Sequence, residues 1–348
     1  MLLKHLSLQN FRSYSKSDFN FSEDVNLIVG PNTSGKTNII EAINLLSTGK
    51  SFRTQNDFEM IRFGDQIARV KAKISQEQDE LEVLLSLTKK FLVNGVGRRR
   101  LDFISNLTTV LFSPADLEII VDSPSIRRNF LNDVLEQVDR EYRVSFLAYT
   151  KALRQRNALL EKTREEGVRS EKQFEYWDEI LVENGQIITA KREEFIKYVN
   201  EAEKDIFDFM IVYDKSIVSK ERLLQYKDAE IGAGVTLVGP HRDDFYFEMF
   251  NGKQNTTHNV KLFGSRGQQR LAILQLKLTQ LLFIKERIGQ NPILLLDDIF
   301  SELDQGHINL VLEMIKSGQT IITTTHKEFI PKEILKQANM IELGNGKV

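Results

Sequence analysis

Short runs rich in apolar and β-branched residues occur at three widely separated places in the chain. They occupy residues 25–29, 293–296 and 321–325. Runs of this length without a helical or alternating period favour strands that are buried on both faces. Each run is followed directly by polar residues that can carry chemistry. The pattern therefore predicts buried strands with functional side chains at their ends.

A second kind of strand is indicated by alternation of apolar and polar positions. In residues 68–93 apolar side chains recur at every second position around a charged hairpin at residues 76–80. This period is typical of antiparallel strands. Residues 2–21 predict a strand, a turn and an edge hairpin. Strand character returns at residues 235–239 and 245–250.

Helical periodicity dominates the middle of the chain. From residue 115 to about residue 227 the sequence is charge-rich and almost free of Pro and Gly, and its apolar positions repeat on one helix face. Residues 37–46 and 271–282 show the same period. We therefore expect an α/β fold. Residues 1–114 and 235–348 would form one lobe with an antiparallel β subdomain, and residues 115–234 an inserted α-helical lobe.

Composition narrows the classes of function. The 348 residues include 47 Lys and Arg and 49 Asp and Glu, which gives a net charge of −2. The chain is therefore no polycation, but this net charge does not exclude a local basic groove. The absence of cysteine excludes disulfides, thiol catalysis and cysteine zinc sites. No apolar run is long enough to span a membrane, and the N-terminus does not resemble a secretion signal. We expect a cytoplasmic protein with no membrane partner.

A glycine-rich loop between the first buried strand and a helix fits the phosphate-loop pattern G-x-x-x-x-G-K-[ST] at every position. It consists of Gly30, Pro31, Asn32, Thr33, Ser34, Gly35, Lys36 and Thr37. A strand, a glycine loop and a helix together point backbone N–H groups and a positive helix end at a polyphosphate. Lys36 is expected to reach the β- and γ-phosphates of ATP, and the Thr37 hydroxyl to bind Mg²⁺.

The two later buried strands end in residues suited to nucleotide hydrolysis. Asp297 and Asp298 follow residues 293–296, and we expect Asp297 to bind the metal and Asp298 to orient the attacking water. Asp298 is one methylene shorter than a glutamate and would hold the attacking water less well. We therefore hypothesise that hydrolysis is slow. His326 ends the third strand, where it could contact the γ-phosphate.

Ser265-Arg266-Gly267-Gln268-Gln269 opens the long helix that precedes the Asp-Asp strand. Serine and glycine at a helix start leave N–H groups available to an anion, so Ser265, Gly267 and Gln268 are candidates for nucleotide contact. The S-x-G-Q pattern by itself is weak evidence for nucleotide contact. Its position between a phosphate loop and an Asp-Asp strand makes it specific.

Two basic loops are candidates for phosphate-backbone contact. Their cations are Lys50, Arg53, Arg98, Arg99 and Arg100. Phosphate contacts require only well-placed positive charge. Exposed basic runs are more often solvated turns, and that alternative stays open here.

The order of these motifs resembles the ATP-binding-cassette ATPases, and among them the RecF family of DNA repair proteins. The matches are residues 10–12, 49–53, 112–114, Pro124 with 127–131, 239–244 and 301–304. Asn132 and Asp122 depart from the residues usual in that family. Neither lies in a nucleotide motif.

The resemblance implies an ATP-binding-cassette head without long coiled-coil arms. Two such heads meet head to tail around two ATPs, so that Ser265 and Asp304 of one chain complete the Lys36 site of the other. It also implies that Arg12 contacts the nucleotide. A slow, DNA-stimulated ATPase would then control binding to duplex and gapped DNA. RecR and RecO proteins would be partners in loading recombinase at gaps, in the settings of replication, DNA damage and the SOS response.

Three alternatives share parts of this pattern. The ATPase subunit of a membrane transporter would carry every nucleotide motif, but it has no use for residues 239–244. The head of a chromosome-organising complex would need long heptad arms, and none are present. A simple phosphate-loop kinase would lack residues 265–269.

Overall fold

The structure is a computed structural model that describes residues 2–74, 79–251, 256–301, 308, 311, 315 and 318–344. The chain forms two compact units. Unit 1 comprises residues 1–116 and 277–348, and unit 2 comprises residues 117–276. Among the described residues, no helix combines the length and apolar character needed to cross a membrane.

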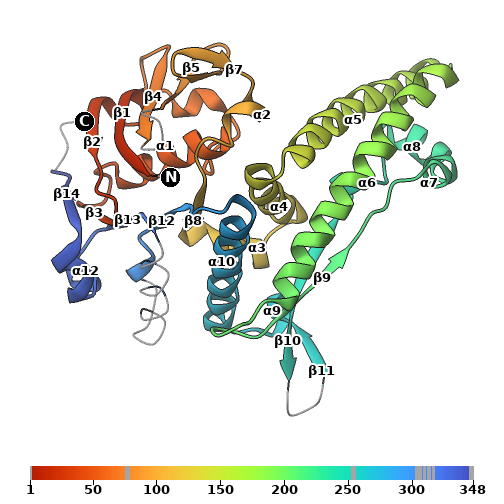
Figure 1. Cartoon of the computed structure of the whole chain (residues 1–348). Helices are drawn as coiled ribbons and strands as arrows, with labels where there is room; N and C mark the ends of the chain where they lie inside the picture. The colour runs from red at the N-terminus through yellow and green to blue at the C-terminus, as the bar shows by residue number, and fades with distance from the viewer. Residues whose placement is uncertain are drawn as a thin grey trace. The chain divides into compact units, whose positions relative to one another are not determined.

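The first sheet of unit 1 has six antiparallel strands in the order β2-β1-β4-β5-β6-β7 (Figure 1). These are β1 (Leu3–Phe11), β2 (Tyr14–Asn20), β4 (Ala68–Ile74), β5 (Glu80–Leu85), β6 (Lys90–Val93) and β7 (Val96–Arg98). Alternate residues of β4 are buried, because successive side chains of a strand point to opposite faces. The predicted antiparallel subdomain is confirmed.

The second sheet of unit 1 is parallel, with the strand order β14-β3-β13-β12-β8. Its strands are β3 (Val25–Val29), β8 (Thr109–Phe112), β12 (Ile293–Asp297), β13 (Thr320–Thr324) and β14 (Asn339–Glu342). All residues of β12 and β13 are buried. In β12 this agrees with the apolar run at residues 293–296, whereas β13 buries two isoleucines together with three β-branched threonines. The ends of β3, β12 and β13 carry the phosphate loop, the two aspartates and the segment leading to His326.

Helix α1 (Lys36–Thr48) packs against strands of both sheets, and eleven of its thirteen residues are buried. Unit 1 contains further elements among the described residues. They are η1 (Asp57–Met60), α2 (Arg100–Phe103), η2 (Pro114–Leu117, which ends in unit 2), η4 (Ile299–Ser301), η5 (Lys327–Phe329), α12 (Lys332–Gln337) and the second half of α10 (Arg266–Ile288). Because α1 is covered on most sides, its polar residues must find partners inside the protein.

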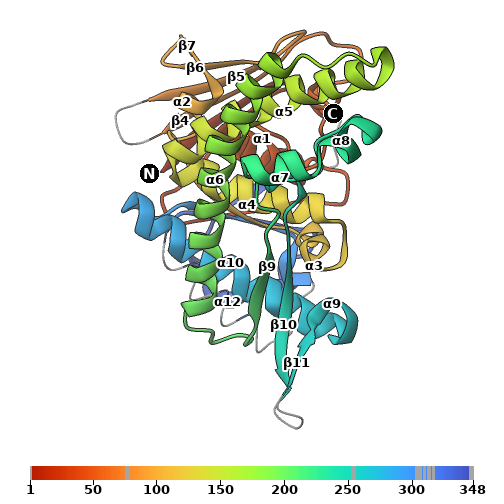
Figure 2. The same cartoon turned by 90° about the vertical axis from the view of Figure 1, so that its right-hand side faces the viewer.

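Unit 2 is built on two long helices that run side by side, α5 (Arg140–Glu166) and α6 (Glu171–Glu201) (Figure 2). Gly167 ends α5 in a left-handed conformation, with φ +69°. A three-stranded antiparallel sheet has the order β11-β10-β9. The other elements are α3 (Glu118–Val121), α4 (Pro124–Val138), β9 (Met210–Asp214), α7 (Lys220–Gln225), α8 (Lys227–Ala233), η3 (Pro240–Arg242), β10 (Asp244–Asn251), β11 (Thr256–Asn259), α9 (Val260–Phe263) and the first half of α10.

The compact units divide the chain differently from the predicted lobes at one boundary. Residues 235–276, which we expected in the α/β lobe, cluster with the helical segment. Strand β10 pairs with β9, and two ion pairs reinforce the association: Arg127 with Asp244, and the buried Arg192 with Asp243. These contacts join residues that are far apart in sequence, which local patterns do not reveal.

The prediction of a strand at residues 235–239 is wrong. The segment makes no ladder; instead, side chains accept hydrogen bonds from its N–H groups. Asn157 accepts from Thr236 at 2.8 Å, and Glu230 accepts from Leu237 at 2.8 Å. Buried backbone groups need partners, and here side chains supply them in place of a neighbouring strand.

Candidate nucleotide-binding site

The phosphate loop lies between β3 and α1, and its conformation requires glycine at two places. Gly35 has φ +97°, and a methyl group there would lie 2.6 Å from the Tyr14 hydroxyl oxygen. A methyl group on Gly30 would lie 2.6 Å from Ser34 Oγ and 3.0 Å from the backbone oxygen of Leu343. Real Cβ atoms do not approach so closely, so the tight packing explains both glycines of the motif.

The Lys36 ammonium lies inside the curve of this loop. Its Nζ donates to the backbone oxygens of Gly30 at 2.7 Å and Pro31 at 2.8 Å. Burial lowers the Lys36 pKa, while Asp298 and Asp297 act in the opposite direction. The lysine is thus held at the helix start where the predicted phosphate would bind.

Thr37 and Asp297 meet beside the loop. Thr37 Oγ1 donates to Asp297 Oδ1 at 3.1 Å, although 260 positions separate the two residues in the chain. Burial raises the Asp297 pKa, and hydrogen bonds from Thr323 and Thr37 oppose that rise. A hydroxyl and a carboxylate oxygen are hard ligands of the kind that Mg²⁺ prefers. The donor set therefore fits the predicted metal.

Asp298 follows β12 in a left-handed conformation with φ +52°. Its N–H donates to Thr323, with the backbone oxygen at 3.2 Å and Oγ1 at 3.1 Å. Residues other than glycine rarely adopt this conformation, and in folded proteins it is often found at functional sites. Asp298 thus reaches the vicinity of Lys36 through a backbone turn that Thr323 stabilises.

His326 lies just beyond β13, with its side chain exposed. Its ring packs edge-on against Phe329, with 5.7 Å between centroids, and Nδ1 lies 4.0 Å from Glu328 Oε2. Its backbone N–H donates to Thr324 Oγ1 at 3.3 Å. The imidazole is therefore available to a ligand, and its contact with a γ-phosphate stays a prediction.

Arg12 lies in the turn between β1 and β2, with φ +53°. Its guanidinium forms a two-pronged ion pair with Glu41 of α1 and donates to the backbone oxygen of Glu59 at 2.6 Å. The sequence analysis missed Glu41. A charged residue within the expected apolar period of residues 37–46 was the available signal, because such a residue has to be paired once the helix is covered.

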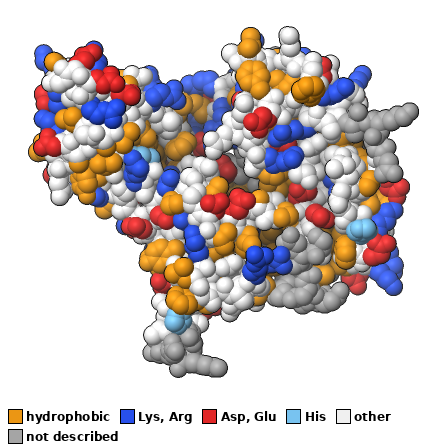
Figure 3. Space-filling model, turned by 180° about the vertical axis from the view of Figure 1, so that it is seen from behind, with side chains coloured by type: hydrophobic (Ala, Val, Ile, Leu, Met, Phe, Trp, Pro, Cys, Tyr) orange, Lys and Arg blue, Asp and Glu red, His pale blue; other side chains and the backbone are white. Residues whose placement is uncertain are grey.

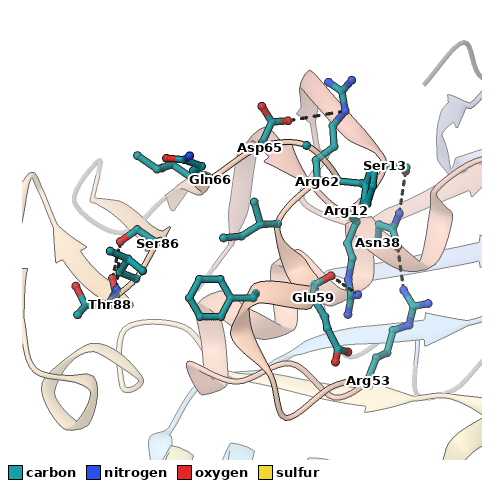
Figure 4. Close-up of a pocket in the computed structure, with 16 residues that line it drawn as sticks. Arg12, Ser13, Asn38, Arg53, Glu59, Arg62, Asp65, Gln66, Ser86 and Thr88 are labelled. Carbon is teal, nitrogen blue, oxygen red and sulfur yellow. Dashed lines mark hydrogen bonds and ion pairs between the residues drawn. The ribbon is translucent and has the colours of Figure 1, made fainter.

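An open cavity of about 1330 Å³ in unit 1 adjoins the start of α1. Figure 4 shows Arg12, Ser13, Asn38 and Arg53 along one side and Gln66, Ser86 and Thr88 along the other. The apolar part of its lining consists of Phe58, Ile61, Phe63, Ile67 and Leu87. The cavity was not predicted because its lining comes from the β1–β2 turn, α1, the segment after α1, η1, residues 61–67 and the turn after β5, which no local pattern connects.

In unit 2, Ser265 of the segment at residues 265–269 caps α10. The Ser265 N–H donates to Gln268 Oε1 at 2.9 Å, and the Gln268 N–H donates to Ser265 Oγ at 3.3 Å. This reciprocal arrangement is a capping box. Ser265 and Gly267 are exposed at the surface. The structure thus explains the helix start, while nucleotide contact by this segment stays a prediction. Asp304 lies outside the described residues.

The five candidate DNA-binding cations differ in their surroundings. Arg53 and Arg98 are exposed, and Arg99 pairs with Asp102 at 2.9 Å. Lys50 is partly buried. Arg100 donates to the backbone oxygen of Thr48 at the end of α1, with Nη2 at 2.7 Å. On the face shown in Figure 3, Lys and Arg side chains are interspersed with acidic and hydrophobic ones.

Comparisons with known proteins agree with this architecture. The family model described as "RecF/RecN/SMC N terminal domain" matches residues 2–343. The "DNA replication and repair protein RecF" of Bacillus thuringiensis (strain Al Hakam) is 36% identical over 374 aligned positions, covering 100% of this chain and 98% of the relative. The RecF protein of Bacillus cereus (strain B4264) gives the same values.

Solved structures show the same relationship. A structure titled "recombination mediator protein RecF-ATP in RecFOR pathway" has a TM-score of 0.86 and 32% identity, covering 94% of this chain and 93% of that one. The related RecF-ATPrS structure has a TM-score of 0.85 and 31% identity, covering 98% and 95%. The fold is that of an ATP-binding-cassette head, and this chain belongs to the RecF family of DNA replication and repair proteins within the RecF/RecN/SMC group.

Proposed function

We propose that this protein binds ATP with Mg²⁺ and uses slow, DNA-stimulated hydrolysis to switch its grip on duplex and gapped DNA. The observation that carries the proposal is the meeting of Lys36, Thr37 and Asp297 at the ends of β3 and β12. Solved RecF relatives whose titles name ATP support it. Asp298 would orient the attacking water, and His326 would contact the γ-phosphate.

Groups within a single chain would make the first contacts with the nucleotide. Phosphates would replace the carbonyl oxygens that Lys36 now contacts, and the N–H groups at the start of α1 would face them. Thr37 and Asp297 would hold Mg²⁺, which neutralises charge developing between the β- and γ-phosphates. Arg12, Ser13 and Asn38 line the cavity, and Asn38 directly follows Thr37 in α1, so the cavity would receive the nucleoside.

Nucleotide binding would drive head-to-tail pairing of two chains. Ser265, Gly267 and Gln268 of one copy, with Asp304, would complete the Lys36 site of the other. A contact made to the γ-phosphate distinguishes ATP from ADP, so hydrolysis would remove the differential binding energy and open the dimer. The closed pair would present Lys50, Arg53, Arg98, Arg99 and Arg100 to DNA phosphates.

The cellular role proposed is recombinational repair at single-strand gaps, with partners related to RecR and RecO. It rests on the RecF relatives, whose solved structures are titled as parts of the RecFOR pathway. The transporter alternative loses its support, because the family match covers nearly the entire chain, including residues 239–244.

Nucleotide binding is tested with Lys36→Met in titrations of a fluorescent ATP analogue and Mg²⁺. We expect affinity to fall at least tenfold, because the loss of one charge-assisted contact to phosphate costs about 1.5–3 kcal/mol. The exposed Lys16→Met variant is the matched control for loss of a lysine charge. Equal affinity in all three proteins would contradict the proposed site.

Dimerisation is tested by light scattering with and without a non-hydrolysed ATP analogue, and with a short DNA duplex. We expect the mass to double with nucleotide, and Ser265→Arg to abolish the doubling. Ser170→Arg is the control, because Ser170 also precedes a long helix of unit 2 and its side chain makes no capping bond. A monomer under every condition would contradict the switch.

A further inference from the structure

Thr323 of β13 forms hydrogen bonds with both Asp297 and Asp298. Its side chain is fully buried, and the parallel register places it directly beside Asp297 of β12. Thr323 Oγ1 donates to Asp297 Oδ1 at 2.6 Å. The same hydroxyl accepts the Asp298 N–H at 3.1 Å. One hydroxyl group therefore joins the two candidate functional residues.

The direction of each hydrogen bond follows from the groups involved. The Asp298 amide can only donate, so the Thr323 oxygen accepts from it and directs its single hydrogen to the Asp297 carboxylate. Thr37 Oγ1 donates to the same oxygen, Asp297 Oδ1, at 3.1 Å. Two hydroxyl donors on one carboxylate oxygen, from α1 and β13, restrict rotation of the carboxylate.

Thr323 also opposes the backbone strain at Asp298. A left-handed residue other than glycine costs about 1–2 kcal/mol. The Asp298 N–H meets the backbone oxygen of Thr323 at 3.2 Å as well as its hydroxyl, so two acceptors of one residue hold this conformation. Removing the hydroxyl would take away one acceptor of the Asp298 N–H in this turn. It would also remove one of the two hydroxyl donors that restrict rotation of the Asp297 carboxylate.

We propose that Thr323 is a positioning residue: it orients the Asp297 carboxylate toward Mg²⁺ and the Asp298 side chain toward the attacking water. The proposal rests on the ATPase function proposed above. Residues that orient metal ligands through hydrogen bonds typically contribute about 10- to 100-fold to metal affinity or activity. Thr323 acts through the two aspartates and needs no contact with substrate.

The deciding experiment uses Thr323→Val, which keeps the shape of the side chain and removes the hydroxyl. Binding of Mn²⁺ in the presence of ADP is followed by electron paramagnetic resonance, and kcat and KM for ATP are measured on the same proteins. We expect Mn²⁺ affinity and kcat each to fall about 10- to 100-fold. The affinity for ADP without metal should change less than about threefold, because the hydrogen bonds of the Thr323 hydroxyl go to Asp297 and Asp298 and not to the phosphate loop.

Three comparison variants separate positioning from general stability. Thr323→Ser retains the hydroxyl and should keep metal affinity within about threefold of wild type. Thr320→Val removes a buried hydroxyl from the other end of β13, where Oγ1 donates to Gly318, and should leave metal binding unchanged. If Thr323→Val does not fold, Thr323→Ala measured against Thr323→Ser gives the same test, since that pair differs by the hydroxyl alone.

The experiment gives different results if only the positioning role of Thr323 is wrong and if the proposed ATPase function itself is wrong. Wild-type Mn²⁺ affinity and turnover in folded Thr323→Val, or in Thr323→Ala, would overturn the positioning role and leave the ATPase proposal standing. A wild-type protein that binds no metal–nucleotide complex would overturn both.

Discussion

The guanidinium group of Arg12 faces the carboxylate of Glu41 in a two-pronged ion pair. Nε lies 2.8 Å from Oε2, and Nη2 lies 2.5 Å from Oε1. Glu41 is fully buried, and its carboxylate also accepts from Ser51 Oγ and from Arg53 Nη1 at 3.3 Å. The β1–β2 turn, the phosphate-loop helix and the segment after α1 therefore converge on one buried carboxylate.

Glu41→Gln should destabilise the protein strongly. The variant retains shape but removes the charge that Arg12 needs, and breaking a buried pair on one side typically costs about 3–5 kcal/mol. The measurement is the free energy of unfolding in urea. Glu80→Gln is the control, because its pair with Lys71 is partly exposed and should be worth about 1 kcal/mol or less. Equal losses in the two variants would show that burial of Glu41 does not govern its contribution.

Gly35→Ala should cost more stability than Gly64→Ala. Both glycines are left-handed, with φ +97° and +90°, so each substitution carries about 1–2 kcal/mol of backbone strain. Only at Gly35 does the new methyl group meet a neighbour, the Tyr14 hydroxyl, while the space around Gly64 is open. Overpacking should add about 1–3 kcal/mol. The free energies of unfolding of the two variants in urea measure the difference. Equal losses of stability would show that the contact with Tyr14 adds no cost at Gly35.

Arg100→Gln and Arg98→Gln should differ in their effect on the stability of the protein. Arg100 donates to the Thr48 oxygen through Nε at 3.1 Å and Nη2 at 2.7 Å, so Arg100→Gln should lower the free energy of unfolding by about 1.5–3 kcal/mol. Arg98→Gln should leave stability within about 0.5 kcal/mol because the side chain is exposed.

If Arg98 contacts a DNA phosphate, Arg98→Gln should weaken duplex binding and reduce the slope of log affinity against log salt by about 1. Duplex titrations at several salt concentrations measure that slope. An unchanged slope would assign Arg98 to the solvated surface of the β6–β7 hairpin.

Acid should destabilise unit 2 through His241. Burial lowers the His241 pKa to about 4. Nε2 faces the backbone oxygen of Thr236 at 3.0 Å, which can only accept, so Nε2 carries the hydrogen and Nδ1 accepts from the Tyr149 hydroxyl at 2.6 Å. The folded protein therefore holds a neutral imidazole. Because the folded pKa lies below the unfolded value of 6.5, the unfolded chain binds more protons between them.

This contribution to stability is present above pH 6.5 and declines as the pH falls toward 4, by about 3 kcal/mol in all. The measurement compares wild type with His241→Gln in urea at pH 7 and pH 4.5, so that effects of other groups cancel. We expect the advantage of the wild type at pH 7 to shrink by about 2–3 kcal/mol at pH 4.5. A difference independent of pH would show that His241 titrates normally in the folded state.

Much of the fold could be predicted because the signals are local. The apolar run at residues 25–29 coincides with β3, and the alternating residues around 68–93 form β4, β5 and β6. The failure at residues 235–239 has a specific cause: strand-like residues there find side-chain partners from α5 and α8, which tertiary packing brings to them. Likewise β14 becomes a strand by pairing with β3.

The sequence by itself determined the phosphate loop, the tandem aspartates, their order and the family, because these depend on residue types at fixed spacings. Only the tertiary structure decided which residues support them. Three consecutive threonines end the third buried strand, and nothing local distinguishes Thr323 from its neighbours. The pairing of β13 with β12 places Thr323 beside Asp297, and the pleat turns adjacent side chains to opposite faces. Glu41 likewise acquires its role from partners that are remote in sequence, since only folding brings Arg12 to α1.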